Sequence, residues 1–429
     1  MCAAMILTSL CFGGCNNSGA QAQFDFKLDT SKEVNLNFIG GLENFEALEA
    51  VIEKFEAKYS NCHITYEYVN EYGKNLATRL QSDSANTHLF LSTKSNFNEE
   101  FFRNTAVDFN DYATNGVNTD KTRAMLTDSQ EIDGKLYLVP LAMTVRGIVV
   151  NKTLLKENNV AVPTNWNEFL AACDTLKNKG YIPIQTQNNA LLINLFYPNI
   201  AVSLVHDADS EKKISELDAY TPGSSQYLKT FFEKAFTIID KGYTSCAENA
   251  AVEDSYEDVI LNFFEGDVAF APCTTETVSG MKKRESKSEA FTAKPFEYEF
   301  FASPTGDDGY QTYWQVWNCV SVNKECDNEN WARAFANFML EEENLTLLAQ
   351  VKGLPANTKN NPSDERFRSL FDVDEAHSTE ATKFQINFYS CINDTLKAIG
   401  TESSTEGHIS DIDGALAFFE EKLAAKKAS

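Results

Sequence analysis

The chain has 429 residues, which is too long for one compact core and predicts two domains or lobes. Hydrophobic residues make up 43% of it and charged residues 23%, a globular composition that excludes a disordered or membrane-embedded protein. There are 62 acidic and 37 basic residues, so the formal net charge is -25. A surface this negative repels phosphate backbones, and we therefore expect no binding to nucleic acid.

The N-terminus carries an apolar run over residues 3–12, followed by two glycines and Cys15. This run is short for a transmembrane helix and suits the apolar core of a signal peptide. Small residues before a cysteine resemble a lipoprotein signal, although Phe12 replaces the expected aliphatic residue and no Lys or Arg precedes the run. We expect residues 1–14 to be a signal peptide, and residues 15–33 to be the N-terminus lipidated at Cys15 and its tether. The alternative is a disordered apolar tail.

Seven cysteines follow Cys15, at irregular spacing and without a C-x-x-C pair. An odd number in this arrangement argues against a disulfide framework and against a zinc site. We expect most of them to be buried thiols that behave as small hydrophobic residues. They are Cys62, Cys173, Cys246, Cys273, Cys319, Cys326 and Cys391.

The chain after the tether begins with a β-α-β pattern. Val34, Leu36 and Phe38 alternate as in a strand, a helical apolar face follows over 45–59, and a second strand over 63–69 comes next. A helix over 72–81 and a strand over 88–91 repeat the pattern. Strands joined by helical crossovers predict a parallel sheet.

Ligands of open parallel sheets bind at the carboxyl ends of the strands. In this chain those ends are residues 40–44 and 92–95. Polar side chains there can hold hydroxyl groups, or they can be ordinary solvated residues, and Lys94 could contact an acidic ligand group or form a surface ion pair. The candidate ligand-binding residues of this part are Glu43, Asn44, Ser92, Thr93 and Lys94.

The segment 132–184 is the most informative part of the sequence. Strand-like runs over 136–141 and 147–150 are separated by what we expect to be a short irregular piece, which carries Thr144 and Arg146. A helix begins after Pro163, and Gly180 provides a permissive stop before a strand over 181–184. Thr144 and Arg146 are candidate ligand-binding residues, although Arg146 could instead form a surface ion pair.

The second half continues the α/β pattern. A helix end and short strand over 262–270 precede Thr275 and Glu276, and a strand over 298–304 precedes an aromatic stretch with Trp314 and Trp317. A strand over 319–322 and helices over 331–339, 384–399 and 409–423 complete the chain.

The order of several motifs resembles the extracellular solute-binding proteins of carbohydrate ABC transporters, the family of maltose-binding protein. Departures are Val150, where the family has Tyr, His88, where it has Asp, and the lack of Trp in the loop after Phe270. The motifs are Asp133-Gly134-Lys135, Asn151-Lys152, Pro163-x-x-Trp166-x-Glu168-Phe169, Lys179-Gly180-x-x-Pro183-Ile184, Phe263-x-x-Gly266-x-x-Ala269 and Gly353-Leu354-Pro355-Ala356.

The resemblance implies the type II two-lobed periplasmic-binding-protein fold, an α/β fold in which each lobe is a mainly parallel sheet flanked by helices. On this basis we assign residues 34–143 and 302–325 to lobe 1, and residues 144–301 and 326–429 to lobe 2. Hinge crossings are expected near Thr144, Ser303 and Asn323. Thr144 would then pass beside the ligand, and the loop with Thr275 and Glu276 would face it.

Trp314 and Trp317 are candidate stacking residues for a sugar ring, because an indole offers a rigid apolar plane with a polar edge. They are three apart, so in a strand they face opposite sides and at least one should be exposed. The alternative is that both are core residues of the strand before Cys319.

The sequence lacks the common signatures of enzymes. There is no G-x-S-x-G, no H-E-x-x-H, no phosphate loop and no G-x-G-x-x-G, and the histidines lack metal-ligand spacing. The one enzymatic alternative that stays open is a glycosidase, because the many acidic residues offer many possible pairs of catalytic carboxylates. We therefore expect a binding protein without catalytic residues, metal or cofactor.

The predicted function is capture of a carbohydrate, most simply an oligosaccharide, and its delivery to the transmembrane subunits of an ABC permease. The protein would be a monomer outside a bacterial cell, held to the outer face of the cell membrane only by its lipid. The alternatives are a receptor for a peptide or other small solute, and a surface sensor or adhesin on the same fold.

Overall fold

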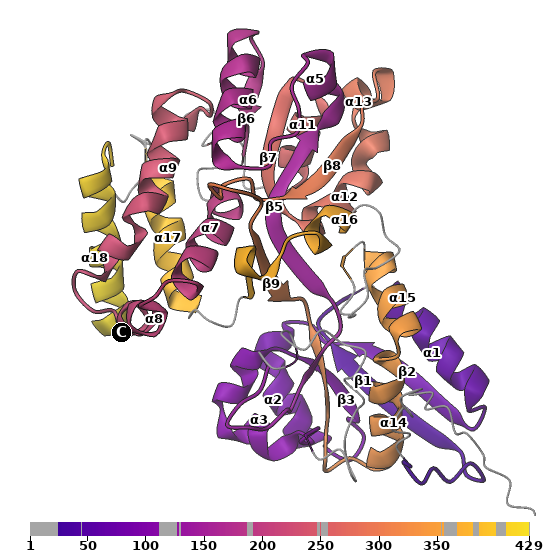
Figure 1. Ribbon diagram of the computed structural model, residues 1–429. Helices are drawn as coiled ribbons and strands as arrows, with labels where there is room; N and C mark the ends of the chain where they lie inside the picture. Colours follow the sequence, from indigo (N-terminus) through magenta and orange to yellow (C-terminus); the bar gives the residue numbers. More distant parts are fainter. Residues whose placement is uncertain are drawn as a thin grey trace, which may run out of the picture.

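In a computed structural model, the protein consists of two lobes, each built on one β-sheet (Figure 1). The signal peptide, Cys15 and Asn44 lie outside the residues that the structure describes. Those residues are 25–43, 45–110, 127, 130–186, 192–246, 249, 256–352, 354–355, 367–380, 386–399 and 409–428.

Lobe 1 contains a five-stranded sheet in the order β2-β1-β3-β10-β4. Strand β1 is parallel to β2 and β3, whereas β10 is antiparallel to both β3 and β4. Four of the five strands therefore run in the same direction, as expected for a mainly parallel sheet, and β10, which enters after a lobe crossing, runs in the opposite direction. The strands are β1 Val34–Gly40, β2 Cys62–Tyr68, β3 Leu89–Ser92, β4 Val139–Pro140 and β10 Cys319–Val322.

Alternating side chains place a hydrophobic layer on each face of this sheet. Leu36 and Phe38 of β1 face α1, α14 and α15, whereas Ile39 faces α2 and α3. The helices of this lobe are α1 Glu46–Lys58, α2 Tyr72–Ser82, α3 Glu100–Thr105, α14 Glu329–Met339 and α15 Glu342–Lys352, with a 3-10 turn η1 Lys94–Asn98.

Helices α14 and α15 pack in lobe 1, which corrects the predicted assignment of residues 326–429 to lobe 2. Trp331 and Phe335 of α14 and Leu345 of α15 belong to the same core as β1 and α1. The physical reason is that the apolar face of α14 covers Val320 and Val322 of β10, the strand that directly precedes it.

Lobe 2 contains a six-stranded mixed sheet with the path β11-β9-β5-β7-β6, and β8 pairs with β5. The long central strand β5 is antiparallel to β7, β8 and β9, whereas β6 is parallel to β7 and β11 is parallel to β9. Five of the six strands therefore run in the same direction, as expected for a mainly parallel sheet. The strands are β5 Met143–Asn151, β6 Ile182–Ile184, β7 Val268–Thr274, β8 Tyr298–Ala302, β9 Thr312–Val316 and β11 Ser378–Glu380.

Strand β5 is continuous through Thr144 and Arg146, so the predicted irregular piece is wrong. All nine of its residues are buried, because three other strands pair with it and helices cover its faces. Gly147 permits this crowding, since a Cβ there would lie 2.2 Å from the carbonyl oxygen of Phe301. Residues 302–316 likewise belong to lobe 2 rather than lobe 1, because β9 pairs with β5.

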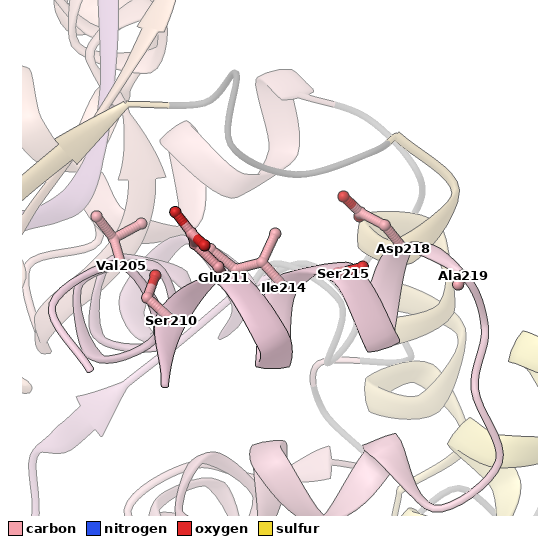
Figure 2. Close-up of a pocket in the computed structure, with 7 residues that line it drawn as sticks. All are labelled: Val205, Ser210, Glu211, Ile214, Ser215, Asp218 and Ala219. Atoms are coloured by element: carbon pink, nitrogen blue, oxygen red, sulfur yellow. The ribbon is translucent and has the colours of Figure 1, made fainter. Parts of the chain in front are cut away.

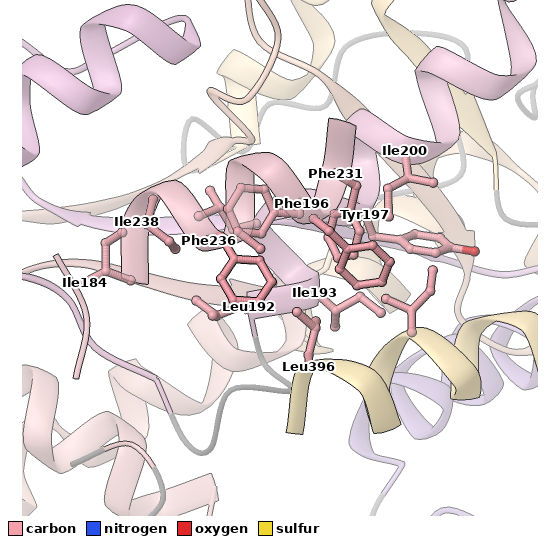
Figure 3. Packing of buried hydrophobic residues seen from close by; sticks show 14 of the residues in the cluster. Ile184, Leu192, Ile193, Phe196, Tyr197, Ile200, Phe231, Phe236, Ile238 and Leu396 are labelled. Carbon is pink, nitrogen blue, oxygen red and sulfur yellow. The ribbon is translucent and has the colours of Figure 1, made fainter. Parts of the chain in front are cut away.

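Two hydrophobic cores fill lobe 2, one on each face of its sheet. Figure 3 shows part of the larger one, where Phe196 and Tyr197 of α7 pack near Phe231 and Phe236 of α9 and Leu396 of α17. The helices of lobe 2 are α5 Lys152–Glu157, α6 Trp166–Asn178, α7 Ile193–Val205, α8 Ser210–Asp218, α9 Lys229–Asp240, α11 Tyr256–Phe264, α12 Thr275–Arg284, α13 Glu289–Ala293, α16 Arg368–Phe371, α17 Ile386–Ala398 and α18 Ile412–Ala428.

The predicted helix after Pro163 is α6. The Asn165 side chain caps it by accepting from the N–H of Glu168 at 3.0 Å, and the Glu168 carboxylate accepts from the N–H of Thr164 at 2.9 Å. At the other end Gly180 has φ +88°, a left-handed conformation that glycine adopts without strain.

The lobe crossings lie side by side and are hydrogen-bonded to one another. The Trp317 N–H donates to the carbonyl of Ala142 at 2.8 Å, and the Met143 N–H donates to the carbonyl of Pro355 at 3.1 Å. Asn318 directly follows Trp317 and has φ +57°. The crossings are therefore near 141–143, 317–318 and 355. The first lies near Thr144, as expected, whereas the other two differ from the expected positions.

Ser303 and Asn323, where we expected crossings, lie inside the lobes. Ser303 pairs with Gln311 in lobe 2, and Asn323 pairs with Ala106 in lobe 1. Each is fully buried and hydrogen-bonded within its own lobe, so neither position is free to act as a hinge.

The cysteines that the structure describes are free thiols, as predicted. Six are buried and Cys246 is partly buried. Burial raises the pKa of Cys62 and of Cys326 to about 12, because a thiolate is poorly solvated there. Within the described chain, no helix is long and apolar enough to cross a bilayer.

Candidate ligand-binding site at the lobe junction

The strand register brings the carboxyl ends of several strands to the junction between the lobes. Strand β3 ends at Ser92, which pairs with Cys319, the first residue after the crossing at Trp317 and Asn318. Strand β9 ends at Val316 beside Met143, and β7 ends at Thr274 beside Arg146. The carboxyl ends, where ligands of such sheets bind, therefore converge on the crossings.

One face of the lobe 2 sheet becomes polar as it approaches this junction. Thr144 pairs with Gln315 and Arg146 pairs with Thr274, and residues paired directly across a sheet point to the same side. Deeper in the lobe the same face carries Ile148, Val150 and other residues of the larger core. The apolar face therefore ends in a group of hydrogen-bonding side chains at the lobe junction.

Arg146 is a buried cation behind this group. It is 8% exposed, and its guanidinium carbon lies 4.7 Å from the ring centre of Tyr389 and 5.8 Å from that of Tyr197. One guanidinium nitrogen donates to the Asn194 side chain. The alternative of a surface ion pair for Arg146 is contradicted by this burial, and the positive charge instead stands over two aromatic rings.

The Trp317 indole N–H approaches the Glu276 carboxylate across the junction. Surrounding protein raises the pKa of Glu276 by weakening its hydration, while the Trp317 indole and the charge of Arg146 oppose the rise. The Glu276 side chain nevertheless has solvent contact. The structure thus brings together three of the predicted site residues, from α12, β5 and the crossing.

Thr275 fixes the helix that carries Glu276. It is fully buried, and its Oγ1 accepts from the N–H of Val145 at 3.2 Å, which ties the start of α12 to β5. Thr275 therefore positions the site rather than lining it. Thr144 is 7% exposed and is the second residue of β5, directly after the crossing.

The two tryptophans differ, because Trp314 lies in β9 and Trp317 lies in the crossing directly after it. Trp317 is partly buried and its ring lies 6.0 Å from that of Phe45 in an edge-on arrangement. Trp314 is 1% exposed in the core, and its Nε1 donates to Ser378 at 2.8 Å. The hypothesis of a ligand-stacking role is therefore wrong for Trp314, because no face of its indole reaches solvent.

The loop after β1 contributes the lobe 1 side of the junction. Tyr66 holds it, because its hydroxyl donates to the carbonyl of Leu42 at 3.0 Å and accepts from the Leu42 N–H at 3.2 Å. Gly40 is required there, since a Cβ would lie 2.3 Å from the Tyr66 hydroxyl. Glu43, next in the loop, is exposed, and Asn44 is outside the described residues.

The loop after β3 is a mixture of structural and exposed residues. Ser92 is 2% exposed and shares a hydrogen bond of 2.8 Å with Ser321, so its hydroxyl is used inside lobe 1 and the ligand-binding hypothesis for it is wrong. Thr93 is exposed and caps the η1 turn with Asn96. Lys94 is partly buried.

A separate hollow of about 730 Å³ is lined by α8 and the end of α7 (Figure 2). Its lining includes the apolar residues Val205, Ile214 and Ala219 and the acidic residues Glu211 and Asp218. None of the predicted site residues lines it. In the described parts of the chain, no group of His, Cys, Asp and Glu side chains is arranged to hold a metal ion.

The sequence matches the bacterial extracellular solute-binding protein family over residues 40–346. The chain belongs to this family. The resemblance indicated by the motifs is thereby confirmed, and membership implies a solute-binding role outside the cytoplasm.

A known relative of this solute-binding protein is the multiple sugar-binding protein of Streptococcus mutans, with 22% identity over 298 residues. The match covers 67% of this chain and 66% of that protein, so this chain spans just under two thirds of the relative's length. The ligands of that relative therefore support a proposal for this chain but do not establish what this chain binds.

Solved structures confirm the two-lobed α/β fold. Apo RafE from Streptococcus pneumoniae has a TM-score of 0.72 at 17% identity, covering 92% of this chain and 98% of RafE. A putative binding protein, msme, from Bacillus subtilis in an open conformation has a TM-score of 0.68 at 14% identity, covering 94% and 98%. Sugar transporter BL01359 from Bacillus licheniformis, in complex with stachyose, has a TM-score of 0.60 at 16% identity, covering 90% and 98%.

Proposed function

We propose that this solute-binding protein captures an oligosaccharide at the lobe junction and delivers it to the transmembrane subunits of an ABC importer. The observation that carries the proposal is the partly exposed indole of Trp317, next to Glu276 and the polar end of the lobe 2 sheet. The names of the similar proteins, which include a multiple sugar-binding protein and RafE in complex with raffinose, support the same class of ligand.

The chemistry of the junction suits a sugar. A pyranose ring has an apolar face, which an indole can cover, and a rim of hydroxyl groups that both donate and accept hydrogen bonds. Glu276 is an acceptor, whereas Thr144 and Gln315 can do both. Glu43, Asn44 and Thr93 would add polar groups from lobe 1, and Lys94 would add a donor.

For transport, binding of the ligand must change the shape of the protein surface that contacts the permease. A ligand that touches both lobes binds the closed form better, so it shifts the population toward closure. Rotation about short hinges is the motion known for periplasmic binding proteins, and here only the crossings near 142, 317 and 355 must change their dihedral angles.

The proposal includes a monomer anchored by lipid on Cys15 to the outer face of the membrane. An acyl chain is the simplest means of holding so acidic a protein near a permease, because anionic lipids repel a net charge of -25. The tether over 15–33 would let the lobes reach the permease.

A thermal-shift screen tests the ligand class. Melting temperature would be measured with melibiose, raffinose, stachyose and maltose to maltohexaose, and with a mixture of short peptides, followed by calorimetric titration of each hit. We expect at least one oligosaccharide to stabilise the protein with a shift that saturates. A saturating shift with peptides and none with sugars would overturn the proposal in favour of a peptide receptor.

The same titration with Glu276→Gln and Trp314→Phe tests the location. We expect Glu276→Gln to weaken binding, because a neutral amide is a poorer acceptor for a hydroxyl. Trp314→Phe, in the core of lobe 2, should leave the affinity of the folded protein unchanged. Equal effects of the two substitutions would place the ligand elsewhere.

A further inference from the structure

Three tyrosines surround the loop where β1 ends, and two of them have structural roles. The Tyr66 hydroxyl holds Leu42, and the Tyr72 hydroxyl donates to the carbonyl of Leu91 at 2.5 Å. Burial raises the pKa of both phenols, that of Tyr66 to about 12. They keep the loop in place and have little ring surface to offer a ligand.

Tyr68, the third tyrosine, is different. It is 44% exposed and, among the residues that the structure describes, it is the one large hydrophobic side chain that is exposed. The sequence has 31 Phe, 16 Tyr and 4 Trp, so aromatic rings are abundant, and the other described ones are buried or only partly exposed. A single exposed ring at this position calls for a reason.

The register places Tyr68 at the junction edge of lobe 1. It is the last residue of β2 and pairs with Gly40, the last residue of β1, and the next N–H, that of Val69, donates to the Gly40 carbonyl at 2.9 Å. Tyr68 thus lies beside the loop that carries Glu43, at the carboxyl ends of parallel strands.

A row of aromatic rings leads from Trp317 to Tyr66, two residues before this position. Tyr68 is on the same side of β2 as Tyr66, because side chains two apart in a strand share a face. The ring of Tyr66 lies 5.7 Å from that of Phe45, which lies 6.0 Å from that of Trp317. Two rings therefore separate Trp317 from Tyr68, so one sugar ring cannot touch both, whereas a chain of sugar rings can.

We propose that Tyr68 is a second stacking surface for the oligosaccharide, holding a sugar ring distant from the one at Trp317. This inference rests on the proposed function and adds to it that the site prefers a ligand of several rings. A tyrosine ring provides a rigid apolar plane at low cost in conformational entropy, and its hydroxyl stays hydrated.

Chain-length dependence is the test, because a distant subsite matters only to a ligand that reaches it. Tyr68→Ala would be titrated by calorimetry with melibiose, raffinose and stachyose and with maltose to maltohexaose. In the series that the wild type binds, we expect the longest members to lose about tenfold in affinity and the disaccharide to change by less than about twofold. Tyr68→Phe, which keeps the ring, should bind every member almost as the wild type does.

His63→Ala is the matched control, because His63 is an exposed ring on the same strand at its amino end. We expect this variant to bind all chain lengths as the wild type does. Melting temperatures of Tyr68→Ala should match the wild type, since the removed ring packs little.

Three outcomes overturn the inference and separate it from the proposed function. If Tyr68→Ala binds all lengths like the wild type, the inference alone fails, and Tyr68 would instead suit a protein partner such as the permease. If all lengths weaken equally, Tyr68 belongs to the primary subsite. If the wild type binds neither series but binds peptides, the carbohydrate function fails and the inference with it.

Discussion

Replacing Trp317 by Ala is the most direct perturbation of the junction, because one residue combines three structural roles. Its backbone N–H donates to the carbonyl of Ala142 at the crossing, its ring contacts Phe45 of lobe 1, and its indole N–H approaches the Glu276 carboxylate of lobe 2. The substitution keeps the backbone bond and removes both side-chain contacts.

The expected loss of affinity is larger than the loss of stability. Truncation of a desolvated aromatic contact in a binding site costs about 2 kcal/mol or more, which corresponds to about thirtyfold in affinity. A core tryptophan cut to Ala costs about 3 to 5 kcal/mol of folding stability through the cavity left behind. Trp317 is partly exposed, so its own folding cost should fall well below that range.

Trp314→Ala provides the comparison within the same chain. Trp314 is 1% exposed and donates a hydrogen bond in the core, so its truncation should lower the melting temperature sharply and leave the affinity of the folded protein nearly unchanged. Denaturation without ligand and calorimetric titration with the oligosaccharide found by screening measure the two quantities. A large loss of stability with unchanged affinity for Trp317→Ala would refute the reasoning.

Four further predictions follow from single features. The raised pKa of Glu276 means that the folded state favours the neutral acid, so this stabilisation is present below the ordinary pKa of 4.5 and is lost as pH rises through the raised value. Because Gln does not titrate, the melting temperature of Glu276→Gln relative to the wild type should increase between about pH 4 and about pH 7. A constant difference would contradict this reasoning. Asn318→Val should cost about 1–2 kcal/mol because φ is +57°, whereas Asn318→Gly should be nearly neutral in denaturant titrations. Cys15→Ser should free the protein from membranes or leave it unprocessed; full retention after a high-salt wash, with normal processing, would disprove the lipid anchor. Saturating ligand should reduce the radius of gyration in solution scattering without a change of oligomeric state, and an identical curve would exclude closure.

The elements of lobe 1 could be predicted well from the sequence because local patterns determine them. Strand β1 shows strict alternation and α1 has a clear apolar face, and β10 has the predicted bounds, Cys319–Val322. The lobe to which an element belongs could not be predicted from such local patterns. The sequence shows that α14 has an apolar face but not which sheet this face packs against, so the assignment of this helix to lobe 2 was wrong.

The sequence could predict which strand ends and loops lie near the site, but not the role of each residue in them. Strand alternation separated Trp314 from Trp317 but could not say which face meets solvent, because that depends on Phe371 and other residues distant in sequence. Ser92 likewise lies at the expected strand end, yet its hydroxyl is used by Ser321 from the returning strand. Tyr68 was missed, although its position two residues after Tyr66 at the end of β2 was a signal available in the sequence.

The pairing of Met143 with Val316 has a consequence for modular construction of this protein. Residues 143–316 leave lobe 1 and return to it at points that are neighbours across two antiparallel strands, about 5 Å apart. Lobe 2 is thus largely a domain inserted into lobe 1 through adjacent entry and exit points, an arrangement that tolerates exchange of the insert. A different ligand specificity could enter by exchange of this segment together with β11, α16, α17 and α18, which complete lobe 2, while the five-stranded sheet and its helices stay as they are.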